Sequence, residues 1–162
     1  MKKWFVLYVL AILLTGCGAE ETFETVSDEL IQSVAAEVRQ VVVTLPIEAA
    51  SPAAESDGGH LYLCGDYEIC RQTLQAGDLN ATVREISGYS KEDLTVIETL
   101  QDDCKRYDLV WVSAGEIGDR VGRAAILDDG NYHYCLSVLG DADSADQYRN
   151  IWQSMFDSFG LD

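Results

Sequence analysis

The fold of this chain is decided by residues 107–139, YDLVWVSAGEIGDRVGRAAILDDGNYHYCLSVL. Three runs rich in β-branched and aromatic residues, which favour strands, cover 107–114, 120–127 and 132–139. The last two runs are joined by Asp-Asp-Gly-Asn, which suits the positive φ angles of a tight hairpin turn. With a further run at 94–100, these segments predict an antiparallel four-stranded meander.

The segment after the meander predicts a long C-terminal helix at 144–159. Its apolar residues fall on one face at helical spacing: Ala145, Tyr148, Ile151, Trp152, Met155, Phe156 and Phe159. We expect this aromatic face to cover the sheet.

The segments before the meander predict further helices and strands. They are a helix at 27–36, a strand at 38–45 ended by Pro46, a flexible loop at 46–60, a hairpin of 61–64 with 67–73, and a helix capped by Asp78 or Asn80 and closed by Gly88. The predicted fold class is therefore α+β, in which two or three helices pack on an antiparallel sheet of about six or seven strands.

The N-terminus has the layout of a secretory signal. Lys2 and Lys3 precede an apolar run from Trp4 to Leu14, which is about half of the roughly 20 residues that a spanning helix needs. A cleaved signal is therefore a better prediction than a permanent transmembrane anchor.

The stretch Leu14-Thr15-Gly16-Cys17 resembles the lipobox of bacterial lipoproteins. This resemblance implies cleavage between Gly16 and Cys17 and a lipid anchor on the Cys17 sulfur. It gives a signal peptide at 1–16, a lipidated tether at 17–25 and a single acidic domain at 26–162, held on the extracytoplasmic face of the cell membrane. Gly18 also permits transfer to an outer membrane, if the cell has one.

The composition restricts the partners. The chain has 28 acidic and 11 basic residues, a net charge of −17, and loss of Lys2 and Lys3 makes it two charges more negative. Such a field repels nucleic acid and favours a cationic peptide or small ligand. We expect a non-enzymatic binding or envelope-accessory domain that needs no cofactor.

Two further resemblances concern the domain itself. The helix with Trp152, Phe156, Ser158 and Phe159 resembles the end of PsbP-like proteins. The Asp-Asp-Gly turn at 128–130, followed by Tyr-His-Tyr, resembles uncharacterised envelope lipoproteins of Gram-positive bacteria. Neither resemblance implies an activity.

Four cysteines in the domain allow two disulfides, because an exported chain can meet an oxidising compartment. Cys104 and Cys135 lie two strands apart in the meander, which disfavours their pairing. We predict Cys64–Cys135 with Cys70–Cys104; Cys64–Cys104 with Cys70–Cys135, or four buried thiols, are the alternatives. The wide spacings do not match a structural zinc site.

Two other groups are candidate sites. His133 and Cys135 share one face of a strand and could activate each other in a thiol hydrolase. Asp141, Asp143 and Asp146 resemble the start of a calcium loop, although Ala145 and Trp152 break the EF-hand pattern. We expect these aspartates to cap the final helix instead. Glu116 and Asp119 could bind a cation from a loop, and His60 is expected to be solvated.

Overall fold

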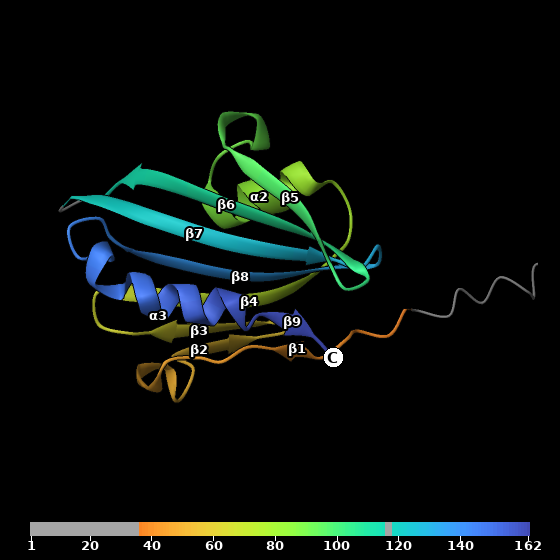
Figure 1. Ribbon diagram of the computed structural model, residues 1–162, viewed down its shortest axis with the longest axis horizontal. Coiled ribbons are helices and arrows are strands. Elements are labelled where there is room, and N and C mark those ends of the chain that lie inside the picture. Colours follow the sequence, from red (N-terminus) through yellow and green to blue (C-terminus); the bar gives the residue numbers. More distant parts are fainter. Residues whose placement is uncertain (1–35, 116–117) are drawn as a thin grey trace, which may run out of the picture. The chain divides into compact units, whose positions relative to one another are not determined.

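The computed structural model describes residues 36–115 and 118–162. They form a seven-stranded antiparallel sheet in the order β2-β3-β4-β8-β7-β6-β5, shown in Figure 1. Its strands are β2 Ala54–Ser56, β3 Gly59–Leu63, β4 Tyr67–Gln75, β5 Val96–Gln101, β6 Cys104–Ala114, β7 Asp119–Asp128 and β8 Tyr132–Asp141. The predicted signal, tether and Cys17, and the helix predicted at 27–36 except its last residue, lie outside the described residues.

The predicted meander is confirmed as β5-β6-β7-β8, in which consecutive strands are neighbours. Asp128 and Asp129 accept backbone hydrogen bonds in the β7–β8 turn, and Gly130 has a φ of 90°. Strand β6 begins at Cys104, earlier than predicted, because Gln101 pairs with Cys104 in a hairpin reversed at Asp102 and Asp103. Pairing of β4 with β8 joins the N-terminal hairpin to the meander.

Helix α2, Leu79–Ser87, covers one face of the sheet. The Asp78 side chain caps it by accepting from the Asn80 backbone N–H at 3.0 Å, and Gly88 ends it with a φ of 80°. Val83 packs there against Leu109, Trp111, Ala124, Ile126 and Cys135. Trp111 occupies the space beside Gly122, its neighbour across β6 and β7, where an added Cβ would lie 2.1 Å from the indole. The sheet therefore needs glycine at this position.

Helix α3, Ala145–Asp157, covers the opposite face, as Figure 1 shows. Trp152, Met155, Phe156 and the following Phe159 are buried against Leu127, Tyr134, Leu136 and Val138. Burial of each large apolar side chain contributes about 1.5–3 kcal/mol, so this contact is a main source of stability. The predicted role of the C-terminal helix is confirmed.

The segment at 38–45 departs from its prediction. Only β1, Val41–Val42, is a strand, and it pairs with β9, Gly160–Leu161, in a separate two-stranded sheet. Val41, Val43 and Leu45 pack against the cluster under α3, whereas Val38 and Val42 are exposed. The run is short as a strand because its partner β9 offers only two residues for pairing.

The segment at 46–60 is more ordered in structure than the predicted loop. It contains a 3-10 turn at Ile47–Ala49 and strand β2, which pairs with β3 through a turn where Gly58 has a φ of 84°. The sequence did not predict β2 because its three residues, Ala-Glu-Ser, are all exposed at the edge of the sheet and show no apolar alternation. The architecture remains a mainly antiparallel sheet with helices packed on it, as the α+β prediction requires. Neither helix among the described residues has the length and hydrophobicity needed to cross a membrane.

Candidate functional site

Four aspartates lie around one end of the sheet, where β7 begins and β8 ends. They line a hollow of about 660 Å³ that we call the acidic groove. Its side chains come from the β3–β4 turn, the start of β7, the connection from β8 to α3, and α3: Asp66, Asp119, Arg120, Asp141, Asp143, Ser144 and Gln147. Gly115 and Gly118 complete the described part of its wall.

Backbone hydrogen bonds hold these loops together. The Asp141 N–H donates to the Asp66 carbonyl at 3.2 Å, and the Ala142 N–H donates to the Asp119 carbonyl at 2.9 Å. Ser144 donates its N–H to the Asp141 carbonyl at 3.2 Å. The main chain thus fixes the rim without using the carboxylates.

The carboxylates of the acidic groove have few internal partners. Asp66 accepts from the Tyr148 hydroxyl at 3.2 Å. The side chains of Asp119, Asp141 and Asp143 accept no hydrogen bond from any residue that the structure describes. Arg120 is the one cation in the described part of the wall. Its guanidinium is 3.4 Å from Glu68 and also donates to the Leu139 carbonyl at 3.2 Å. The groove therefore keeps an uncompensated negative charge, which attracts cations.

The aspartates predicted as a calcium loop do not assemble into one. Asp141 and Asp143 line the groove, but Asp146 pairs with Arg149 on the surface of α3 at 2.6 Å. Over residues 36–115 and 118–162, no three His, Cys, Asp or Glu side chains come close enough to hold a metal ion. The prediction that these aspartates cap α3 is wrong, because the N-cap is Ser144 and no side chain caps the helix. Asp146 lies in the first turn, where its charge favours the positive N-terminal end as predicted.

His133 and Cys135 do not form the pair that a thiol hydrolase needs. The His133 ring is buried, with Nδ1 2.8 Å from the Thr82 hydroxyl of α2 and Nε2 3.8 Å from Asp128. The Cys135 thiol donates instead to the His133 backbone carbonyl at 3.7 Å. Burial strongly raises the pKa of Cys135, so the thiolate nucleophile is disfavoured. His133 holds α2 on the sheet through its hydrogen bond with Thr82, and Cys135 does so by packing in the cluster that contains Val83.

The described part of the chain contains no disulfide, and the positions of its four free cysteines do not favour the predicted pairing. Cys64 packs under α3, whereas Cys135 packs on the opposite face, so their bridge would have to cross the sheet. Cys70 and Cys104 lie on β4 and β6, separated by two strands. That separation is roughly 14 Å between backbones, beyond the reach of a disulfide.

In the alternative pairing, one of the two cysteine pairs lies on neighbouring strands. Cys70 lies opposite Ser137 and Cys135 lies opposite Gln72, so the two cysteines are diagonal neighbours on β4 and β8. Cys64 and Cys104, however, lie near opposite ends of the sheet, because Tyr67 pairs with Gly140 and Lys105 pairs with Asp128. The register of the sheet decides which cysteines lie near one another, and the spacing of cysteines in the sequence does not specify that register.

The remaining candidates have separate positions. His60 belongs to β3 and is half-buried, with Nδ1 3.3 Å from Arg71, rather than solvated in a loop. Asp119 lines the acidic groove, whereas Glu116 lies outside the described residues. Asp66, Arg120 and Gln147 were not among the predicted site residues; the signal for Asp66 was its place in the predicted turn between 61–64 and 67–73.

Comparison with known proteins gives a likeness of fold. A crystal structure of a protein from Bacteroides thetaiotaomicron VPI-5482 has a TM-score of 0.51 and 7% identity. The match covers 75% of this chain but 45% of that one, so the present chain spans under half of its length. The solution structure of cyanobacterial PsbP from Synechocystis sp. PCC 6803 has a TM-score of 0.45 and 12% identity over 75% of this chain and 82% of that chain.

The second likeness is consistent with the PsbP-like resemblance as a distant one and carries no functional argument. No protein-family model matches the chain, and no curated protein matches it either. What the comparisons show is a fold shared with the Bacteroides structure at very low identity, without an activity.

Proposed function

We propose that this chain is a lipid-anchored, extracytoplasmic binding domain that takes a cationic ligand in its acidic groove. The observation that carries the proposal is a set of three carboxylates, those of Asp119, Asp141 and Asp143, around a hollow of about 660 Å³; none of them accepts a hydrogen bond from a residue that the structure describes. A hollow of that volume suits ligands the size of a small molecule. The ligand class is therefore a polyamine or the lysine and arginine side chains of a peptide.

The proposed location outside the cytoplasm is inferred from the N-terminal sequence. The apolar run up to Leu14 and the lipobox-like Leu14-Thr15-Gly16-Cys17 support processing before Cys17 and lipid attachment there. A domain tethered in this way meets its ligand outside the cytoplasm, where it functions as a binding or envelope-accessory module.

A titration with tetralysine tests the acidic groove. Replacing Asp141→Asn and Asp143→Asn together should weaken binding about 10-fold, because each exposed ion pair contributes up to about 1 kcal/mol. The matched control is Asp146→Asn with Asp157→Asn, which removes the same charge from α3 outside the groove. An equal loss in the control would assign binding to the general field of the protein and overturn the site. Tetraglutamate should not bind.

A Cys17→Ala variant of the full chain tests the anchor. The unchanged chain should appear in the membrane fraction with the mass of a lipidated product beginning at Cys17. The variant should retain its signal or leave the membrane. Finding the unchanged chain in the cytosol with Met1 in place would contradict the proposal.

A further inference from the structure

Strand β5 is a free edge of the seven-stranded sheet. Within the described ranges it pairs with β6 alone, and it offers six residues, whereas the opposite edge strand β2 has three. Natural sheets protect such edges with lysine, proline or very short strands. The sequence of β5, VIETLQ, contains no lysine or proline, and its one charged residue is Glu98. An open and regular edge of this kind is suited to pairing with another strand.

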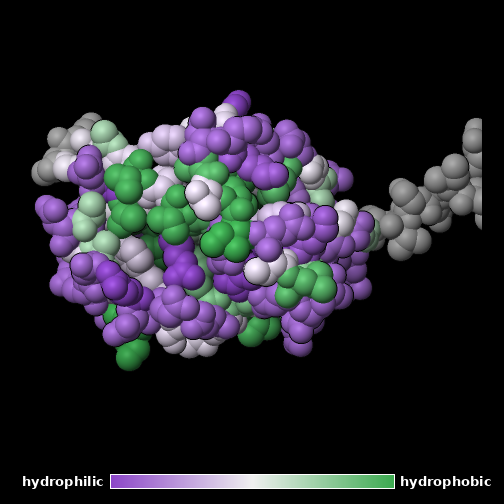
Figure 2. Space-filling view, turned by 45° about the horizontal axis from the view of Figure 1, so that its top comes forward, coloured by the Kyte–Doolittle hydropathy of each residue, from purple (hydrophilic) through white to green (hydrophobic). Residues whose placement is uncertain are grey.

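Apolar side chains accompany this edge on both faces. Ile97 is 58% exposed and Leu100 is 76% exposed, and they point to opposite faces because they pair with Asp108 and Lys105. Val110 and Val112 of β6 extend the exposed apolar surface on the face of Ile97. Figure 2, which brings the β5 side of the molecule forward, shows hydrophobic surface gathered in the middle of this face.

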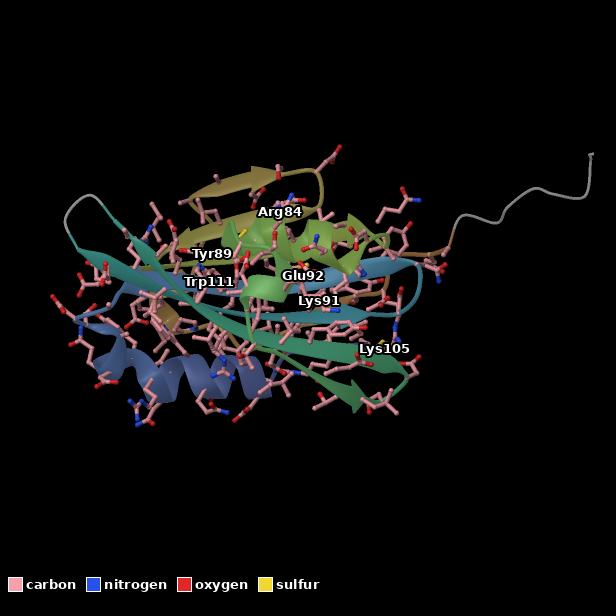
Figure 3. All side chains as sticks on the ribbon, turned by 90° about the horizontal axis from the view of Figure 1, so that it is seen from above. Arg84, Tyr89, Lys91, Glu92, Lys105 and Trp111 are labelled. Carbon is pink, nitrogen blue, oxygen red and sulfur yellow. The ribbon has the colours of Figure 1, made fainter. Side chains whose placement is uncertain are left out.

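Acidic residues flank β5 at both ends. Glu92 and Asp93 precede it in a 3-10 turn, and Asp102 and Asp103 follow it. Figure 3 shows Lys91 and Glu92 near the start of β5 and Lys105 toward its far end. Lys105 is 3.9 Å from Glu98, and Asp103 is already paired with Arg39 at 2.9 Å. The edge thus carries the exposed apolar side chains Ile97 and Leu100 on either side of Glu98 and Thr99, and acidic residues lie beyond both of its ends.

We infer that β5 accepts an extended segment of a partner protein as an added strand, and that this segment is apolar in its middle and basic at both ends. Backbone hydrogen bonds would supply affinity, while Ile97, Val110 and the flanking acids would supply selectivity. A second copy of this chain is the wrong partner, because antiparallel pairing of two β5 strands would bring Glu92 and Asp93 against Asp102 and Asp103. This surface is distinct from the acidic groove, so the inference does not rest on the proposed function.

The test uses the full domain and a ten-residue peptide with two lysines at each end and alternating valine and threonine between them. Binding should slow amide hydrogen exchange in β5 and shift its NMR signals and those of β6. A peptide with proline at two central positions should lose at least 10-fold in affinity, because it cannot complete the ladder. A peptide with glutamate in place of lysine should not bind.

Matched variants locate the contact. Ile97→Lys with Leu100→Lys should weaken binding at least 10-fold, whereas Ile47→Lys with Leu63→Lys, which changes the same residue types at exposed positions elsewhere, should not. Both pairs should keep the melting temperature of the unchanged chain. Asp141→Asn with Asp143→Asn should leave the peptide-induced signal shifts of β5 intact, even where it removes lysine binding from the acidic groove, which separates the two sites. Equal binding of the proline peptide, signal shifts confined to the groove, or dimerisation through β5 would overturn the inference.

Discussion

The two ends of the β7–β8 hairpin are both rich in aspartate, but they use it differently. At the turn, the Asp128 carboxylate accepts one backbone hydrogen bond and the Asp129 carboxylate accepts two. At the open end, Asp119 begins β7 and Asp141 ends the neighbouring strand β8. Their carboxylates have no hydrogen-bond partner among the described residues. The difference separates aspartates that stabilise the fold from those available to a ligand.

The turn end of the hairpin holds residues 36–39 in place. Asp129 accepts from the backbone N–H groups of Asn131 and Tyr132 at 2.8 and 2.7 Å and from the Tyr134 hydroxyl at 3.0 Å. Tyr134 in turn accepts from the Arg39 N–H at 2.9 Å, and the Tyr132 hydroxyl donates to the Ala36 carbonyl at 3.0 Å. The two tyrosines of the Tyr-His-Tyr segment therefore bind residues 36–39, and its histidine binds α2.

The largest effect should come from Asp129→Ala. It removes an acceptor from three donors at once, and hydrogen bonds to a charged group contribute about 1.5–3 kcal/mol each before water replaces some of them. We expect a loss of about 3 kcal/mol in the free energy of unfolding, measured by urea denaturation. A loss below about 1 kcal/mol would contradict the structural role assigned to this residue.

The same carboxylate should make stability depend on pH. Although burial alone would raise the pKa of Asp129, hydrogen bonds from Tyr132, Asn131 and Tyr134 lower it below its ordinary value. The folded state then binds this proton less readily than the unfolded chain. Its contribution is present above the unfolded pKa of about 4 and is lost as pH falls through the lower folded pKa.

Melting temperatures recorded between pH 6 and pH 2.5 check this sign. Asp129→Asn should flatten the decline below about pH 4 relative to the unchanged chain. An identical decline in both proteins would assign acid sensitivity to other carboxylates.

Tyr134→Phe should have a smaller effect at the turn end. The substitution removes one hydroxyl that links Asp129 to the Arg39 backbone. We expect a loss of about 1 kcal/mol. Faster amide exchange at Arg39 would show that the loss arises from this contact, whereas unchanged exchange there would argue against it.

The smallest effect is expected in the acidic groove. Asp141→Asn with Asp143→Asn should change the free energy of unfolding by less than about 0.5 kcal/mol, because neither side chain has a hydrogen-bond partner in the described structure. Urea denaturation beside Asp129→Ala measures the contrast directly. A loss of 2 kcal/mol or more in the groove variant would show that these aspartates also stabilise the fold.

Local pattern predicted the strong elements well. Alternation and turn residues located β6, β7 and β8, and Asp78 with Gly88 marked both ends of α2. Short strands were missed because β2 and β9 gain their pairing from distant partners rather than from their own sequences. For the candidate site, Asp119, Asp141 and Asp143 were recognised as acidic positions, but their meeting with Asp66 was not predicted.

The sequence by itself determined the α+β architecture and the acidic field, because these follow from periodicity and composition. The lipid anchor stays a prediction from a contiguous motif. Only the tertiary structure decided which acids and thiols meet. Register places Cys64 and Cys135 on opposite faces, and it brings Asp66 beside Asp141 although they are far apart in the chain. Contacts between distant segments depend on strand pairing and helix packing, which no local pattern specifies.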